Sequence, residues 1–139
     1  MDPLDTLHET LEEARLSCDS LNTMLTSSHP PLVLDLRSFL VYNQAHVKGS
    51  INVCIPKTLA KRQGFTVKSI ESGICKKGDK DDFRLRAGAQ VVLYDQAGAE
   101  YRDPASLLAK CFESLIREGA CQRVFWLDGN KTQFPSINK

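Results

Sequence analysis

The sequence PLVLDLR, residues 31–37, decides the fold class of this chain. It follows a break at Ser28, His29 and Pro30, and its apolar side chains run without interruption up to an aspartate and an arginine. A short apolar run after such a break is typical of a strand that is buried on both faces, as in a parallel sheet. We therefore predict a buried strand over residues 31–37.

Helices and further strands are expected to alternate after this strand. Ser38 is placed to cap a helix that turns Phe39, Leu40 and Tyr42 inward. The other predicted elements are strands over residues 50–53, 90–95 and 123–127, a solvated loop over 71–86 with a helical turn near Phe83, and an amphipathic helix from Pro104 to Gly119. Strands separated by helices predict an α/β domain with a mainly parallel sheet that is covered on both faces.

Two helices are expected ahead of the first strand. Leu4, Leu7 and Leu11 recur at helical spacing and predict an amphipathic helix over residues 1–14, placed as an extension before a single domain over 15–139. A stripe of this kind favours packing against the domain's own core, and binding to a partner is the alternative. Asp19 or Ser20 is placed to cap the second helix.

Size, charge and cysteine usage bound the possible functions. The 139 residues allow one domain with its own core, and the net charge of +1 provides no global field for nucleic acid or anionic lipid. No cofactor is expected. The five cysteines have irregular spacing and the three histidines stand apart, so we expect neither a disulfide framework nor a metal site. The absence of a leader-like or membrane-spanning run predicts a soluble intracellular protein, cytoplasmic, nuclear or both.

The sequence IPKTLAKRQGFTV, residues 55–67, carries the clearest candidate for recognition. We call it the docking segment. It joins an expected helical turn, from Lys57 to Lys61, to the adjacent cations Lys61 and Arg62 and then to Phe65 and Val67. Two cations ahead of alternating apolar side chains are suited to an acidic patch beside an apolar groove on another protein. The alternative is an amphipathic segment whose cations are only solvated.

Several motifs, in order, resemble those of rhodanese-like domains. The first group is LDLR at 34–37 with Tyr42, His46, Gly49–Ser50 and Asn52, and it resembles the first half of such domains. VVLYD at 91–95 resembles the strand before their active loop, and FWLDG at 125–129, with Phe134 and Pro135, is similar to their closing motif. The resemblance covers residues 15–135. It implies the three-layer fold shared with the related cell-cycle phosphatases, with a mainly parallel sheet of five strands.

The same resemblance implies that the reactive position has lost its nucleophile. Active rhodaneses and the related phosphatases place a cysteine directly after the Val-x-Tyr strand, where backbone amides stabilise the thiolate. Here that position is Asp95, and none of the five cysteines lies in the loop that follows. We therefore expect no catalytic residue and no enzymatic activity in this chain.

A narrower resemblance concerns the docking segment. NVCIPKTLAKR at 52–62 is similar to the basic kinase-interaction segment in the amino-terminal domain of MAP kinase phosphatases, and to a run in fungal tyrosine phosphatases that act on MAP kinases. The resemblance implies a regulatory domain of a dual specificity or tyrosine phosphatase whose catalytic domain is absent from this chain. It would bind a MAP kinase through five residues: Lys57, Lys61, Arg62, Phe65 and Val67.

Two other functions remain open at this point, and four residues have a structural interpretation. The chain is alternatively a small sulfurtransferase or phosphatase that uses a displaced cysteine such as Cys75 or Cys121, or a structural module that forms homo-oligomers. Four residues are expected to be structural. Asp35 and Arg37 would fix the loops at the strand ends, and His46 would bond to backbone near Gly49.

Overall fold

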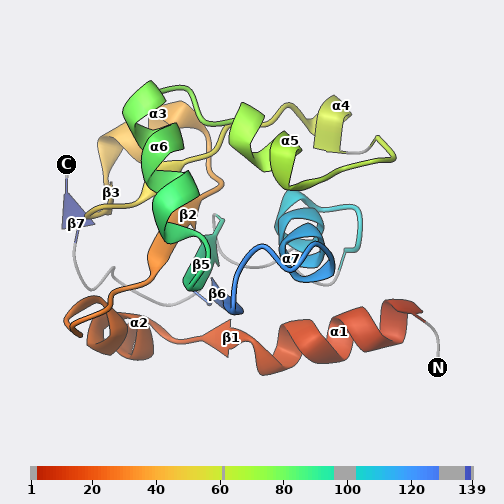
Figure 1. Cartoon of the computed structure of the whole chain (residues 1–139), viewed down its shortest axis with the longest axis horizontal. Coiled ribbons are helices and arrows are strands. Elements are labelled where there is room, and N and C mark those ends of the chain that lie inside the picture. The colour runs from red at the N-terminus through yellow and green to blue at the C-terminus, as the bar shows by residue number, and fades with distance from the viewer. Residues whose placement is uncertain (1–2, 61, 96–102, 129–136, 139) are drawn as a thin grey trace.

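The computed structural model describes residues 3–60, 62–95, 103–128 and 137–138, and at the chain ends and in α4 it describes some of these by their backbone alone (Figure 1). Its centre is a five-stranded sheet in the order β1-β6-β5-β2-β4, with all neighbouring strands parallel. The predicted α/β fold and parallel sheet are confirmed. The strands are β1 (Arg15–Leu16), β2 (Leu32–Asp35), β4 (Ile51–Asn52), β5 (Gln90–Tyr94) and β6 (Arg123–Leu127).

The two central strands explain why the sheet needs cover on both faces. Every residue of β2 is buried, and β5 is buried from Val91 onward. Leu34 pairs with Leu93 in register and both belong to one apolar cluster, while Val33 and Val92 belong to a second cluster. Because successive side chains in a strand point to opposite faces, both faces of β2 and β5 are apolar.

Helices from distant parts of the chain form these two covers. The helices are α1 (Pro3–Glu13), α2 (Cys18–Leu25), α3 (Phe39–Gln44), α4 (Lys57–Ala60), α5 (Val67–Ser72), α6 (Lys77–Arg86) and α7 (Leu107–Arg117). The larger cluster takes buried side chains from α1, α5, α6 and α7, and the smaller one takes Cys18 and Leu21 of α2. A separate antiparallel pair, β3 (His46–Val47) with β7 (Ile137–Asn138), lies outside the main sheet.

Serine caps begin three of the helices. Ser38 accepts a hydrogen bond from the Val41 amide at 3.3 Å, as the sequence predicts. Ser106 does the same for Ala109 at the start of α7. The cap of α2 is Ser17, which accepts from the Ser20 amide at 3.1 Å, so the predicted caps Asp19 and Ser20 were each placed too late.

Two predictions about helices are wrong. Residues 71–86 are not mainly loop, because α6 occupies Lys77–Arg86 and buries Phe83 against the core. In α3, Phe39 and Leu40 do not face inward, and their exposed fractions are 50% and 75%. The helix is six residues long and contains no buried residue.

The first helix is attached to the last strand of the main sheet. Leu11 of α1 is fully buried, and its carbonyl accepts a hydrogen bond from Nε1 of Trp126 in β6 at 2.6 Å. Arg15 follows in β1, pairs with Trp126 in register and lies over its indole ring, with 5.2 Å between the guanidinium carbon and the ring centroid. The division into an extension over 1–14 and a domain over 15–139 stays a prediction. Within the described ranges, no helix combines the length and the apolarity that crossing a bilayer requires.

Candidate functional site

A buried ion pair lies at the carboxyl end of β2. The Asp35 carboxylate accepts hydrogen bonds from Nη2 of Arg37 at 2.6 Å and from Nε at 3.0 Å, and the two side chains are 2% and 7% exposed. Arg37 Nη2 also donates to the Ala45 carbonyl at 2.7 Å. Burial disfavours the charged guanidinium, but the hydrogen bond and charge of Asp35 outweigh it, so the pKa of Arg37 is raised. The pair therefore holds the turn after β2 against the end of α3.

Neighbouring side chains extend this arrangement, which we call the edge cluster: Asp35, Arg37, Tyr42, His46 and Asn52. The side-chain nitrogen Nδ2 of Asn52 donates to the backbone carbonyls of Asp35 and Arg37, each at 3.0 Å. The Tyr42 hydroxyl donates to the Ser50 carbonyl at 2.6 Å. The polar groups of the edge cluster thus bind the protein's own backbone.

His46 has a different partner from the predicted one. Its Nδ1 donates to the Tyr42 carbonyl at 2.8 Å, and its ring stacks on the Tyr42 ring with centroids 3.8 Å apart. The bond therefore does not go to backbone near Gly49. Gly49 itself has a φ of +81°, a conformation that side chains disfavour, so it serves the turn before β4.

The position of the expected nucleophile follows β5. Asp95 comes directly after Tyr94 at the carboxyl end of that strand, and the residues of the following loop, 96–102, lie outside the described residues. The Tyr94 ring lies under the guanidinium of Arg37, with 4.8 Å to the centroid. Burial raises the pKa of Tyr94 to about 12. This phenol is therefore neutral at physiological pH.

The cysteines lie elsewhere, and all five are free thiols. Burial raises the pKa of Cys54, Cys111 and Cys121, the last to about 11. Such thiols are largely protonated at neutral pH, and the thiolate is the form that attacks. Cys75 is exposed. No group of three or more potential metal-ligating side chains is present in the described part of the chain.

The docking segment is built around α4. Ala60 is 4% exposed and anchors this one-turn helix, and the Arg62 amide donates to the Leu59 carbonyl at 3.2 Å to close the turn after it. Arg62 is exposed, and its guanidinium makes no hydrogen bond or ion pair with the residues that the structure describes. Lys61 lies outside the described residues, and the side chain of Lys57 is likewise not described.

The second half of the docking segment is held by α7. The Phe65 carbonyl accepts from Arg117 Nη2 at 2.9 Å, and the Val67 amide donates to Oε2 of Glu118 at 2.8 Å. Phe65 is only 7% exposed and belongs to the larger core cluster, and the half-buried Val67 packs against that cluster. The expectation that Phe65 is an accessible anchor is therefore wrong, because the domain uses this ring for its own core.

Leu59 is the accessible apolar residue that the sequence reasoning missed. It is 45% exposed and lies in α4, three residues before Arg62. The spacing of three residues between Leu59 and Arg62 could have indicated it, because residues three apart lie on the same face of a helical turn. The sequence reasoning chose the Phe65 and Val67 pair instead.

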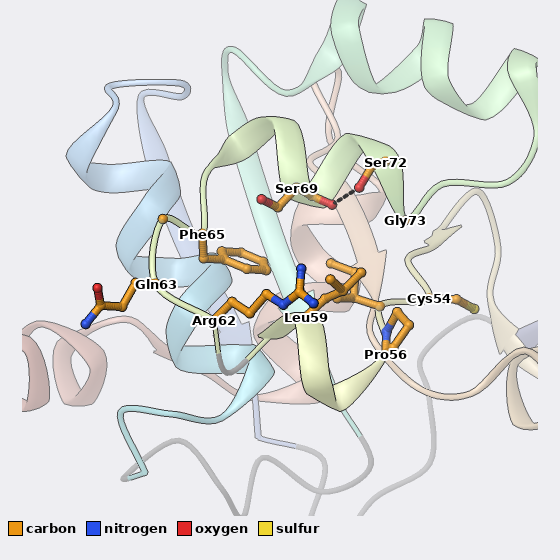
Figure 2. A pocket seen from close by; sticks show the side chains of 11 residues that line it. Cys54, Pro56, Leu59, Arg62, Gln63, Phe65, Ser69, Ser72 and Gly73 are labelled. Carbon is orange, nitrogen blue, oxygen red and sulfur yellow. Dashed lines mark hydrogen bonds between the residues drawn. The ribbon is translucent and has the colours of Figure 1, made fainter.

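A hollow of about 290 Å³ lies between α4 and α5 (Figure 2). The side chain of Arg62 extends along it toward Leu59 and Pro56, and Phe65 and the two serines of α5 also line it. The lining residues are Cys54, Ile55, Pro56, Leu59, Arg62, Gln63, Gly64, Phe65, Ser69, Ser72 and Gly73. None of them is acidic.

Gly73 brings the docking segment close to the end of α5. The Cys54 amide donates to the Gly73 carbonyl at 2.9 Å. A Cβ at Gly73 would lie 2.7 Å from Cγ1 of Ile55 and 3.0 Å from the Cys54 carbonyl oxygen. The close approach of these backbones therefore requires glycine, and Gly73 itself is one of the residues that line the hollow.

Comparisons with known proteins identify the relatives of this arrangement. Residues 17–134 match the sequence profile described as the rhodanese-like domain. The chain is 33% identical over 108 residues to dual specificity protein phosphatase 7 of Homo sapiens, covering 74% of this chain and 25% of that protein. It is 29% identical over 107 residues to dual specificity protein phosphatase 6 of Homo sapiens, covering 74% of this chain and 28% of that protein. The chain thus spans about a quarter of the length of these curated relatives.

A solved structure gives the same result for the fold. The full-length protein from Lactobacillus plantarum superposes with a TM-score of 0.52 at 19% identity, covering 97% of this chain and 95% of that one. The sequence matches confirm the resemblance to rhodanese-like domains and to the amino-terminal region of MAP kinase phosphatases. The solved structure shows a shared fold and nothing further.

Proposed function

This chain belongs to the family of rhodanese-like domains, and on that premise we propose that it is a non-catalytic docking and regulatory domain that binds a MAP kinase. Its homology to dual specificity phosphatases supports a phosphatase as the parent protein. In the proposed complex, Arg62, together with Lys57 and Lys61, faces acidic residues of the kinase. Residues 1–14 extend the domain, and the protein works in the cytoplasm, the nucleus or both.

The observation that carries this proposal is the unpaired state of Arg62 among the described residues, at the rim of a hollow with no acidic lining. An arginine held in an internal ion pair would lose that pair on binding, whereas Arg62 loses none to the described residues. Surface ion pairs contribute only about 0–1 kcal/mol each, so apolar contacts must accompany the cations. Leu59 supplies accessible apolar surface next to Arg62.

The test is calorimetry of the whole chain with a panel of MAP kinases. We expect the double variant Lys61→Ala with Arg62→Ala to weaken kinase binding at least about tenfold, or about 1.4 kcal/mol. A matched control removes the same charge elsewhere: Lys76→Ala with Lys77→Ala, two exposed lysines at the start of α6. Equal affinity of the docking variant and the wild type across the panel would refute the assignment of the site.

The same preparation tests the proposed lack of catalysis. We expect no cysteine-dependent turnover of thiosulfate or of an aryl phosphate. Turnover that disappears in Cys75→Ser or Cys121→Ser would support an enzyme with a displaced nucleophile instead.

A further inference from the structure

The hollow between α4 and α5 is large enough to admit one side chain, and its lining combines apolar and polar groups. Its volume of about 290 Å³ falls at or below the range of roughly 300–1,000 Å³ that is usual for small-molecule sites. Phe65 and Ile55 give it apolar walls, and both are tied to the main core cluster. The walls are therefore fixed by the domain's own packing and exist before a partner binds.

The rim of the hollow determines what can enter. Arg62 lies at the rim as an exposed cation, and the neighbouring hydroxyl of Ser72 donates to the Ser69 carbonyl at 2.7 Å. With no carboxylate in the lining, the local charge complements an acidic group and disfavours a basic one. The geometry suits an apolar side chain with a carboxylate beside it.

We propose that the hollow is a socket for an apolar side chain of the docked kinase, flanked there by an acidic residue that pairs with Arg62. This inference rests on the proposed kinase docking and deepens it. The sequence led us to expect that Phe65 inserts into a groove of the kinase. Because Phe65 is already part of the domain's core, we infer the reverse: a side chain of the kinase inserts into the hollow of this domain. Leu59 forms one wall of the hole and remains half exposed for contact.

The test fills the hollow without changing its charge. Ser72 ends α5 and is exposed, so Ser72→Trp introduces bulk at the rim with little disturbance of the core. We expect Ser72→Trp to weaken kinase binding about tenfold, the scale of losing one well-packed interface side chain. Ser72→Ala is expected to bind as the wild type does, because the hydroxyl bonds to the domain's own backbone.

Thr23→Trp is the matched control for added bulk. Thr23 is an exposed residue of α2 on the other cover of the sheet, and its hydroxyl also bonds to a helix carbonyl. We expect this variant to leave kinase affinity unchanged. Circular dichroism of each variant confirms that the fold is retained.

A second variant pair gives an independent readout that does not depend on Ser72. Leu59→Ala removes one wall, and Leu85→Ala changes a leucine that is 83% exposed in α6. We expect Leu59→Ala to weaken binding and Leu85→Ala to have no effect. Weakening by Leu59→Ala but not by a folded Ser72→Trp would overturn the socket in favour of a protruding leucine.

The variant Lys61→Ala with Arg62→Ala, measured alongside, separates the two proposals. If it weakens binding while Ser72→Trp and Leu59→Ala bind like the wild type, the socket is refuted and kinase docking stands. If the wild-type chain binds no kinase of the panel, both proposals fall together.

Discussion

The edge cluster and the docking segment use their arginines in opposite ways. Arg37 is buried, bonded to Asp35 through two nitrogens and bonded to backbone at Ala45. Arg62 is exposed, and among the described residues no acid pairs with it. The first arginine therefore maintains the fold at the carboxyl end of β2, and the second is available to another molecule. The same residue type is committed to the fold or left exposed according to what its neighbours already satisfy.

The largest expected effect concerns the buried pair. Asp35→Ala leaves the Arg37 guanidinium buried without its carboxylate, and removing one partner of a buried pair costs about 3–5 kcal/mol. We expect that loss in the free energy of unfolding, measured by urea denaturation. Glu71→Ala is the control, since it breaks the ion pair with the exposed Arg84, and we expect no resolvable change. If Asp35→Ala and Glu71→Ala lower the free energy of unfolding equally, the distinction between the buried and the exposed ion pair is wrong.

An intermediate effect is expected at the contact between Cys54 and Gly73. Gly73→Ala forces a Cβ against Ile55 and the Cys54 carbonyl, and overpacking of this kind costs about 1–3 kcal/mol. It should also alter the width of the hollow and weaken kinase binding. Both quantities are measured on one preparation, by denaturation and by calorimetry.

Gly78→Ala is its control. No atom lies within 4 Å of a Cβ at Gly78, which is in the first turn of α6. Alanine is favoured over glycine in helices by up to about 1 kcal/mol, so this variant should be as stable as the wild type or more stable. A destabilised Gly78→Ala would mean that the effect at Gly73 does not come from close packing.

The smallest expected effect is a pH dependence at Tyr94, whose ring lies against Arg37 of the edge cluster. The folded-state pKa of Tyr94 is about 12, above its ordinary value of 10.0, so the folded protein favours the neutral phenol. This contribution to stability is fully present below pH 10 and is lost as the pH rises toward 12. Tyr94→Phe should therefore lose less stability than the wild type over that interval, measured by denaturation under reducing conditions. If the stability of Tyr94→Phe and of the wild type falls equally over this interval, folding does not remove the Tyr94 phenol from water and the prediction is wrong.

The sequence was sufficient for features that depend on local pattern. The uninterrupted apolar run at 31–37 predicted β2, the serine before Phe39 predicted a cap, and alternating elements predicted the parallel sheet. These predictions succeed because buried strands and helix caps favour particular residue types, and because the order of strands and helices limits how the strands can be connected. Homology then confirmed the family that the scattered motifs had indicated.

The features that were missed depend on three-dimensional context. The two residues of β1 are too few to show an alternating pattern. The helix α6 is rich in charged residues and Phe83 is its buried residue, so the sequence shows no repeat of apolar residues at helical spacing there. Phe39 and Phe65 are the same residue type, yet the first is 50% exposed and the second 7%. Which of two phenylalanines a core has room for is decided by packing partners such as α7, which lie far away in the sequence.

The hydrogen bond between the Trp126 indole and the Leu11 carbonyl has a practical consequence. The chain contains a single tryptophan, so its entire indole emission arises at this junction between the first helix and the last strand of the sheet. If that helix lifts away, water reaches the ring and the emission shifts to longer wavelength. The protein thus carries an intrinsic fluorescent probe of whether its first helix is packed against the sheet, and no dye or label is needed to follow it in the isolated chain.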